Sequence, residues 1–330
     1  MRIDPTLRAL ADMTRLRIMR LLAHMELAVG ELAQVLGQSQ PRVSRHIKIL
    51  CDAGLAERRK EGAWVFLRSA IGPERAPPLG AAVARLLAVA EADDAQFAAR
   101  CAEDRRHLAA IRAGREAAAA DYFARHAAEW DSLRSLHSAD GPVEAALVGA
   151  LAEQRTAGLG RLLDVGTGTG RIAELLAPRA THVTGLDMSP EMLRIARARL
   201  QHLPADSVDL VQGDFGALPF ADGGFDTVTL HQVLHYAQEP GRVLAEAARV
   251  LTPGGRIAVV DFAAHDHEAL RTEHAHARLG FSDEAMLALF ADAGFAGDAP
   301  VALPGERLTV KIWTATRSTA RTDNFDREKA

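Results

Sequence analysis

The sequence predicts a multidomain fold in which a helical module with a β-hairpin precedes an α/β module. Two observations support this. Apolar residues recur at helical spacing over the first fifty residues and then give way to an alternating pattern over 55–68. Further along, an apolar strand at 161–165 meets a glycine-rich turn, and strand and helix patterns alternate afterwards. We place the boundaries at 1–75, 76–150, 151–317 and 318–330, the last a polar segment expected to be disordered.

The composition indicates a soluble globular chain. Of 330 residues, 48% are hydrophobic and 25% charged, enough for two domains with separate cores. The two cysteines, Cys51 and Cys101, exclude a disulfide framework and suit a reducing compartment. The N-terminus lacks a signal-peptide pattern, and no apolar run approaches the ~20 residues of a membrane helix, so we expect a cytoplasmic protein that avoids membranes.

Charge is distributed unevenly along the chain. The net charge is -4, but residues 1–75 hold 13 Lys and Arg against 8 Asp and Glu, a balance of +5. The remainder therefore carries -9. Because arginine outnumbers lysine 35 to 4, the position of each arginine is more informative than their number. A basic head on an acidic body is the charge distribution expected of a nucleic-acid-binding module.

The first module is expected to contain a helix-turn-helix. A short helix over 29–36 ends at Gly37, a position that favours glycine. The next helix runs from Pro41 to Ala53, capped by Ser39 or Gln40, with proline in its first turn. Its apolar residues at 43, 47 and 50 form a narrow buried stripe, which leaves polar side chains on the other faces.

These polar side chains suit a helix that reads base edges in the major groove. After Gly54, strands over 55–60 and 63–68 joined at Glu61 and Gly62 form a wing whose basic tip would contact phosphates. The predicted DNA-contacting residues are Ser39, Gln40, Arg42, Ser44, Arg45, His46, Arg58, Arg59 and Lys60.

The stretch from Ser39 to Leu55, with the basic run before Gly62, resembles the ArsR-type winged-helix repressors. The resemblance implies a winged helix-turn-helix that binds double-stranded operator DNA as a homodimer. The alternative is a winged helix used only for protein contacts or dimerisation. Many such repressors sense metals through a Cys-x-Cys pair on the helix before the turn, but here that helix has no thiol. A thiolate metal sensor of that kind is therefore not expected.

Two helical segments connect the modules. The first carries Val83, Leu86, Leu87 and Ala90, and the resemblance places the dimer interface there. The second spans about 94–120 with apolar residues at near-heptad spacing, and either packs on a partner or serves as an amphipathic spacer.

The following segment, 122–131, resembles the helix that precedes the catalytic domain in small-molecule methyltransferases of the ubiquinone and menaquinone biosynthesis type. This resemblance puts Tyr122 near the methionine end of the cofactor, whereas the simpler interpretation is helix packing by its aromatic residues.

The second module begins with a nucleotide-binding pattern. The strand 161–165 is followed by the glycine loop 166–170 and a helix over 171–177. A second strand ends at Asp187, 21 positions after Gly166, where a carboxylate binds ribose hydroxyls. This much also fits a nicotinamide-binding domain.

Later motifs favour a different cofactor. Asp164 precedes the glycine loop, Asp214 follows a third strand, and two more strands cover 225–231 and 251–260, before a late strand at 308–316. Together these resemble the class I S-adenosylmethionine-dependent methyltransferases. The resemblance implies a seven-stranded Rossmann-like sheet that binds S-adenosylmethionine or S-adenosylhomocysteine. The cofactor residues that it implies are Tyr122, Asp164, Gly166, Thr167, Gly168, Gly170, Asp187, Met188, Gly213, Asp214, Phe215 and His231.

No catalytic residue is assigned from the sequence. Positioning of two reactants can supply much of a methyl transfer, and a general base is needed only if the acceptor must lose a proton. His231 and His235 are candidates, with cofactor contact or packing as the alternative. The histidine-rich segment 265–276 would place His267, Arg271, His274 and Arg278 on one helical stripe, and because arginines repel cations we expect a polar lid rather than a metal site.

Three functions remain open. The first is a transcriptional regulator that senses the cofactor, since the architecture resembles fused regulators that respond to S-adenosylhomocysteine and control methionine-cycle genes. The second is an active small-molecule methyltransferase that also represses its own operon. The third is a methyltransferase with a structural winged helix. Arsenite is not the expected acceptor, because arsenite methyltransferases bind arsenic through several cysteines and the second module has none.

Overall fold

The computed structural model describes residues 1–23, 25–61, 64–71, 77–131, 140–152, 158–204 and 206–319. They form two compact units. The first comprises Met1–Ala118 with Asp266–Glu268, and the second comprises Ala119–His265 and the chain from Ala269 onward. The tail expected at 318–330 lies outside the described residues from 320 on.

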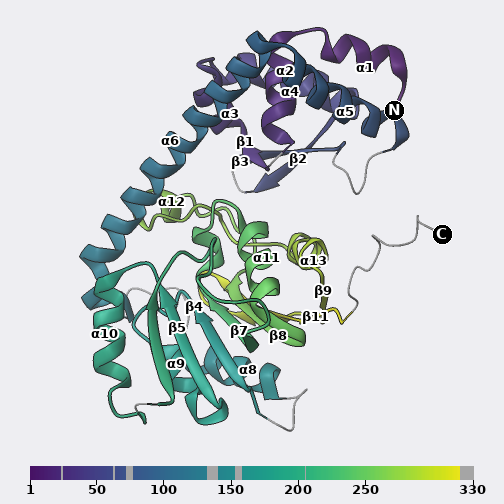
Figure 1. The fold of residues 1–330 in the computed structure, drawn as a ribbon. Coiled ribbons are helices and arrows are strands. Elements are labelled where there is room, and N and C mark those ends of the chain that lie inside the picture. The colour runs from purple at the N-terminus through teal and green to yellow at the C-terminus, as the bar shows by residue number, and fades with distance from the viewer. Residues whose placement is uncertain are drawn as a thin grey trace, which may run out of the picture. The chain divides into compact units, whose positions relative to one another are not determined.

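The first unit is a winged helix-turn-helix (Figure 1). In chain order its elements are α1 (Ile3–Leu10), α2 (Met13–Leu22), β1 (Leu27–Ala28), α3 (Val29–Leu36), α4 (Gln40–Asp52), β2 (Ala56–Glu61), β3 (Trp64–Ser69) and α5 (Pro78–Asp93). Strands β2 and β3 form the expected antiparallel hairpin, and β1 pairs with the other edge of β3. The hairpin turn at Gly62 lies outside the described residues.

The core of this unit is built from the apolar faces that the sequence pattern predicts. Val43, Ile47 and Leu50 of α4 are each at most 1% exposed and pack with residues from α1, α2 and α3. Gly37 ends α3 with φ +63°, a conformation that favours glycine. Ser39 occupies the N-cap position of α4 as expected, but its side chain makes no capping hydrogen bond.

The long helix α6 (Ala95–His126) starts in the first unit and ends in the second. In the first unit it is attached to the helix-turn-helix by ion pairs. Arg17 of α2 makes a bidentate contact with the buried Asp104, with Nε 2.7 Å from Oδ2. Arg115 donates at 2.8 Å to Glu31 of α3, a carboxylate that is only 3% exposed. The same Glu31 accepts the backbone N–H of Ala28, so one carboxylate holds both the start of α3 and the side of α6.

The second unit is a twisted sheet between two layers of helices (Figure 1). Its helical elements are the end of α6, η1 (Ala127–Glu129), α8 (Asp140–Ala152), α9 (Arg171–Leu176), η2 (Ala177–Arg179), α10 (Pro190–Leu200), η3 (Leu234–Tyr236), α11 (Pro240–Val250), α12 (Ala269–Glu273) and α13 (Asp283–Asp292). Its strands are β4 (Arg161–Val165), β5 (His182–Asp187), β6 (Val208–Gln212), β7 (Phe225–His231), β8 (Leu251–Phe262), β9 (Phe295–Gly297), β10 (Val301–Pro304) and β11 (Thr309–Arg317).

Strand order within the described residues is β10-β11-β8-β7-β4-β5-β6, with β9 also paired to β11. Strands β4 to β8 are parallel neighbours, while β11 runs antiparallel to β8. The predicted seven strands become eight because the edge strand is interrupted. Asp298, which follows β9, still donates its backbone N–H to the Thr314 carbonyl, and its carboxylate accepts hydrogen bonds from Thr314 and Arg256. Pairing with β11 resumes only at Val301 of β10, shifted by one residue relative to β9.

Alternate residues of the central strands fill two cores. Ile257 and Val259 of β8 pack with α11 and α13, whereas Ala258 and Val260 face α8 and α9. This two-sided burial explains why these strands read as continuous apolar runs. Because β4 pairs in parallel with β5 and β7, the carboxyl ends of these strands meet at one edge, where ligands bind in folds of this kind.

The helical stripe expected for the histidine-rich segment is wrong. Helix α12 covers only 269–273, so His267, His274 and Arg278 do not share a helix with Arg271. The chain turns at Ala275, which has φ +58°, and the guanidinium of Arg271 donates to the carbonyl of Ala277. Separately, no helix among the described residues is long and apolar enough to cross a bilayer.

Candidate cofactor site and nucleic-acid interface

The glycine loop between β4 and α9 requires its glycines. Gly166, Gly168 and Gly170 have φ values of +67°, +54° and +81°. A Cβ on Gly166 would lie within 2.8 Å of Val233 Cγ1 and closer still to Cγ2, and one on Gly170 would lie 3.1 Å from Ala196. The loop therefore packs against the segment after β7 on one side and against α10 on the other.

Asp164 lies beneath this loop and organises it. The carboxylate is 1% exposed and accepts hydrogen bonds from the hydroxyls of Thr167, at 2.7 Å, and Thr229, at 2.8 Å. Burial raises the pKa of Asp164 from its usual 3.8 to about 6, although the two hydroxyls oppose that rise. In the described structure Asp164 thus ties the loop to β7.

Asp187 lies at the end of β5, as expected for a ribose-binding carboxylate. Its Oδ2 accepts the Gly168 N–H at 2.8 Å and its Oδ1 accepts the Ser189 N–H at 2.9 Å. Burial raises the pKa of Asp187 and these N–H donors lower it. Each carboxylate oxygen has a second lone pair for a ligand hydroxyl, so this donor set fits the ribose of an adenosyl group.

A network that the sequence analysis missed covers the other side of the loop. The carboxylate of Asp131 accepts from Thr169 Oγ1 at 2.7 Å and pairs with Arg199 of α10, which also donates to Thr169 at 2.9 Å. The indole Nε1 of Trp130 lies 3.7 Å from where a Gly168 Cβ would be. In the sequence, only the hydroxyl of Thr169, which lies between two of the predicted glycines, could have indicated this network.

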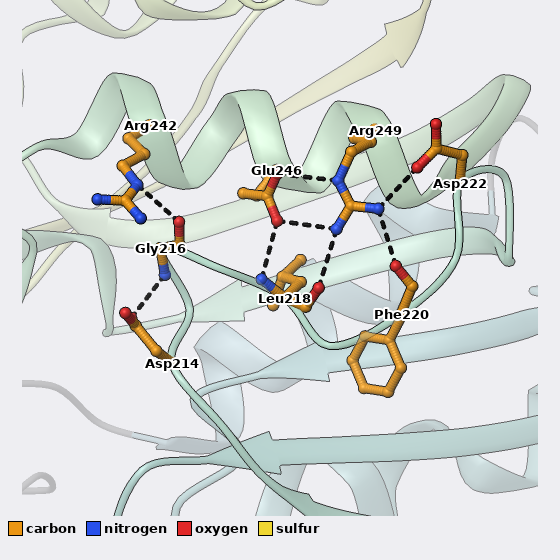
Figure 2. A network of polar contacts seen from close by, with 8 residues as sticks. All are labelled: Asp214, Gly216, Leu218, Phe220, Asp222, Arg242, Glu246 and Arg249. Carbon is orange, nitrogen blue, oxygen red and sulfur yellow. Dashed lines mark hydrogen bonds and ion pairs between the residues drawn. The ribbon is translucent and has the colours of Figure 1, made fainter.

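The loop after β6 carries the residues expected to contact adenine, and Arg249 holds it in place (Figure 2). From α11, this guanidinium donates to the carbonyls of Phe220 and Leu218 at 2.8 and 2.9 Å and pairs with Asp222 and Glu246. The Glu246 carboxylate in turn accepts the N–H of Leu218. A short loop without regular structure is thus fixed through its own backbone.

The predicted adenine residues lie on this loop and next to it. Asp214 is exposed and accepts the Gly216 N–H at 2.7 Å, and Phe215 packs against the core. The Gly213 N–H donates to the Asp187 carbonyl, so the ends of β5 and β6 are directly linked. Met188 is 47% exposed, which is consistent with a side chain that lies over a ligand rather than in the core.

An aromatic and histidine cluster adjoins the glycine loop. The hydroxyl of Tyr122 lies 2.8 Å from His274 Nδ1, and burial raises the pKa of Tyr122. Phe123 makes edge contacts with Trp130 and Tyr236, at centroid separations of 5.3 and 4.9 Å. Since Trp130 adjoins Gly168, the cluster extends from the cofactor loop to the segment after β7.

The two candidate histidines differ in surroundings. His231 ends β7 and is 8% exposed. His235 lies in η3 and is 1% exposed, with Nδ1 2.8 Å from the Asp261 carboxylate at the end of β8. Asp261 was not singled out from the sequence, although an acid inside the apolar run 257–262 was a visible signal.

The recognition helix presents the expected polar surface. Ser39, Gln40, Arg42, Ser44 and Arg45 are all exposed. His46 is different, because its ring turns towards α2, where Nδ1 lies 3.6 Å from the carboxylate of Asp12, and its side chain is only 14% exposed. The exposed residues lie along the first turns of α4, outside its buried stripe.

The three basic residues of the wing were all expected to contact DNA, but their surroundings differ. Alternation along β2 separates Arg58 from Arg59. Arg58 is exposed, whereas Arg59 makes a bidentate pair with Glu26 at 3.1 Å and stacks over Phe66. A contact from Arg59 to phosphate would have to break that pair. Lys60 lies on the same strand, and its side chain is outside the described structure.

Comparison with known proteins gives a family match in each unit. Residues 12–58 match the family model described as bacterial regulatory protein, arsR family, and residues 163–259 match the model described as methyltransferase domain. The chain is 41% identical over 102 residues to a demethylmenaquinone methyltransferase of Renibacterium salmoninarum, which is 31% of this chain and 41% of the relative.

A ubiquinone/menaquinone biosynthesis C-methyltransferase, UbiE, of Methylobacterium nodulans is 42% identical over 123 residues, covering 36% of this chain and 48% of the relative. The chain thus spans less than half the length of these curated relatives. Among solved structures, a Haloferax volcanii methyltransferase in complex with its Trm112 activator superposes with a TM-score of 0.50 at 24% identity. That match covers 59% of this chain and 97% of the other, and it supports the fold.

The order β6-β5-β4-β7-β8-β11, with β11 antiparallel, is the sheet of a Rossmann-like methyltransferase. Helices α2, α3 and α4 of the first unit lie within the match to the regulatory family. The chain therefore joins a helix-turn-helix domain of the bacterial arsR regulatory family to a class I methyltransferase domain.

Proposed function

We propose that the protein is a DNA-binding transcriptional regulator whose second unit binds S-adenosylmethionine or S-adenosylhomocysteine as the sensed ligand. The observation that carries this proposal is helix α6. Its first part is fixed to α2 and α3 through Asp104 and Arg115, and its last turns contribute Tyr122 and Phe123 to the cluster beside the glycine loop. Residues of α6 thus take part in both units, in the DNA-binding module of the first and in the surroundings of the candidate cofactor site of the second.

Within the second unit, we assign the ribose to Asp187, the adenine to the loop of Gly213, Asp214 and Phe215, and the methionine end to the surroundings of Tyr122 and Asp164. The bound sulfonium would supply a methyl group that is activated for transfer. The chain's own residues hold the ligand, and the cluster around Trp130 excludes water from it.

A regulator of this kind responds only if the ligand binds the DNA-competent and incompetent states with different affinity. The test is fluorescence anisotropy with a DNA duplex selected from a random pool by this protein, titrated with and without each ligand. We expect either ligand to change the DNA affinity by about 5-fold or more, as typical coupling energies predict. A DNA affinity that neither ligand changes would refute the sensing function.

Two variants make the test specific. Asp187→Ala should abolish ligand binding measured by calorimetry and leave the ligand-free DNA affinity unchanged. Arg45→Ala should weaken DNA binding by roughly 1–3 kcal/mol if this exposed side chain contacts a base, and leave ligand binding unchanged. Ligand binding that survives Asp187→Ala would show that the cofactor site is misplaced.

We also propose that the protein acts as a homodimer through α5. Leu86 and Val89 on this helix are each 55% exposed, while Val83 and Leu87 on its other face are buried. Two-fold symmetry would bring two recognition helices to successive half-sites. Leu86→Glu should yield a monomer in light scattering, with greatly weakened DNA binding; a dimer that persists would place the interface elsewhere.

The second candidate function is an active small-molecule methyltransferase that represses its own operon. The paired His235 and Asp261 favour it, since a purely sensory domain does not need a buried carboxylate–imidazole pair. The matched relatives are named as quinone methyltransferases, and a flat quinol is therefore a reasonable acceptor to test.

A further inference from the structure

The second unit contains a buried carboxylate–imidazole pair outside the residues assigned to the cofactor. His235 follows β7 in η3, and Asp261 lies near the end of the neighbouring strand β8. Their side chains are 2% and 0% exposed, and His235 Nδ1 is 2.8 Å from Asp261 Oδ1. Both groups are thus removed from water and held by each other.

The hydrogen bonds of Asp261 define which imidazole nitrogen carries the proton. Its Oδ1 also accepts the Phe262 N–H at 2.7 Å, and its Oδ2 accepts the His235 N–H at 3.1 Å. A carboxylate with two backbone donors is an acceptor, so the 2.8 Å contact requires His235 Nδ1 to donate. The Nε2 of His235 then carries a lone pair, and it is buried without a hydrogen-bond partner in the part of the chain that the structure describes.

A buried acceptor without a donor is rare in folded proteins and calls for an explanation. Its location supplies one. Val233, two residues before His235, packs against Gly166 of the cofactor loop. Tyr236, the next residue, contacts Phe123, which in turn contacts Trp130 beside Gly168. The imidazole therefore lies at the ligand-binding edge of the sheet.

The groups around the imidazole are mainly flat rings. His276 lies over His235 with ring centroids 4.1 Å apart, Tyr236 lies at 4.1 Å and Phe262 at 5.2 Å. Such walls suit a flat acceptor, which would take the place of the His276 ring. The segment that carries His276 contains the strained Ala275 at φ +58°.

We propose that His235 is the general base of a methyl transfer and that Asp261 is its positioning residue. In this step the O–H bond of a flat hydroxyl-bearing acceptor breaks and its proton moves to Nε2. The acceptor oxygen forms a bond to the methyl carbon, and the carbon–sulfur bond breaks with its electron pair left on sulfur. The products are the methyl ether, S-adenosylhomocysteine and a protonated imidazole that returns its proton to water.

This inference rests on the proposed binding of S-adenosylmethionine, and of the two measurements that test it the first does not depend on that binding. In full-length protein with ¹⁵N-labelled histidine, NMR should show that His235 carries a proton on Nδ1 and none on Nε2. Asp261→Asn should allow the proton to move to Nε2, because an amide can donate to Nδ1. A proton on Nε2 in the wild type would overturn the proposal.

The second measurement is transfer of tritiated methyl from S-adenosylmethionine to catechol, 4-hydroxybenzoate and 1,4-naphthohydroquinone. His235→Asn keeps a donor for Asp261 but has no Nε2. We expect it to lower transfer by about 10²- to 10⁴-fold, the range of a general base, while S-adenosylhomocysteine affinity stays within about 3-fold. The control is Thr227→Val, which removes a buried hydrogen bond to Leu159 away from this cluster and should retain transfer.

The outcomes separate the two proposals. Failure of the wild type to bind S-adenosylhomocysteine would refute the cofactor site, whatever the imidazole tautomer. Binding with no transfer to any of the three acceptors, or transfer that His235→Asn leaves unchanged, would overturn the role of His235 while the cofactor site stands.

Discussion

Replacement of Gly166 by alanine tests the geometry of the cofactor loop. At φ +67° an alanine is in the left-handed region, which costs about 1–2 kcal/mol. Its Cβ would also lie within 2.8 Å of Val233 Cγ1, well inside the ordinary contact distance of about 3.5–4.0 Å. Overpacking of this kind costs about 1–3 kcal/mol. We therefore expect Gly166→Ala to destabilise the second unit by about 2–5 kcal/mol and to abolish binding of S-adenosylhomocysteine.

The two contributions can be separated by a double-mutant cycle with Val233→Ala. Removal of the valine methyls relieves the overpacking but not the backbone strain, so the double variant should recover about 1–3 kcal/mol relative to additivity. Urea unfolding would be followed by tryptophan fluorescence in a Trp64→Phe background. There the remaining tryptophans, Trp130 and Trp313, both lie in the second unit. Effects that add within about 0.5 kcal/mol would refute the contact between Gly166 and Val233.

Three further predictions concern single side chains. Asp164 has a pKa of about 6 in the folded chain against a usual 3.8, so the folded chain binds this proton more tightly than the unfolded chain. The free energy of unfolding of the wild type relative to Asp164→Asn should therefore be greatest below pH 4. It should fall by about 3 kcal/mol as the pH rises through 6. A difference in unfolding free energy that is independent of pH would contradict this. Arg249→Met should lower the free energy of unfolding by about 1–3 kcal/mol and weaken ligand binding through the loop of Asp214. Arg242→Met removes a single hydrogen bond to Gly216 and should do neither. Equal effects of the two variants would refute the role of Arg249. Arg58→Met should reduce the slope of log DNA affinity against log salt concentration by about one phosphate contact. Arg59→Met should leave this slope nearly unchanged, because Arg59 is paired with Glu26. Titrations at several salt concentrations distinguish the two variants.

Much of the fold follows from local sequence signals. The buried stripe of α4, the end of α3 at Gly37 and the strand–glycine–helix unit at 161–176 each depend on residues close in the chain, and the structure confirms them. The order of the motifs also defined the Rossmann-like sheet. The interruption of the edge strand after Asp298 could not be predicted, because the one-residue shift in its pairing is set against β11, which follows later in the chain.

The candidate site was predicted less completely, for the same reason. The acidic residues at strand ends are visible as a pattern, but Asp131 acquires its role only when the chain brings it to Thr169 and Arg199. The partner of Arg59 and the turn of His46 towards Asp12 are likewise tertiary contacts. The histidine-rich segment was misjudged because helical spacing alone does not reveal where a helix ends.

Helix α6 has a practical consequence for how this chain can be divided. Its 32 residues correspond to about 48 Å of continuous helix, and the boundary between the two units falls inside it, between Ala118 and Ala119. A cut before the helix would remove the buried residues Cys101 and Leu108 from the first unit. A cut after it would remove Tyr122 and Phe123 from the second unit. Gene shuffling that swaps either half for a homologous one should therefore place its junction inside α6, so that each half keeps the helical residues that its own unit packs against.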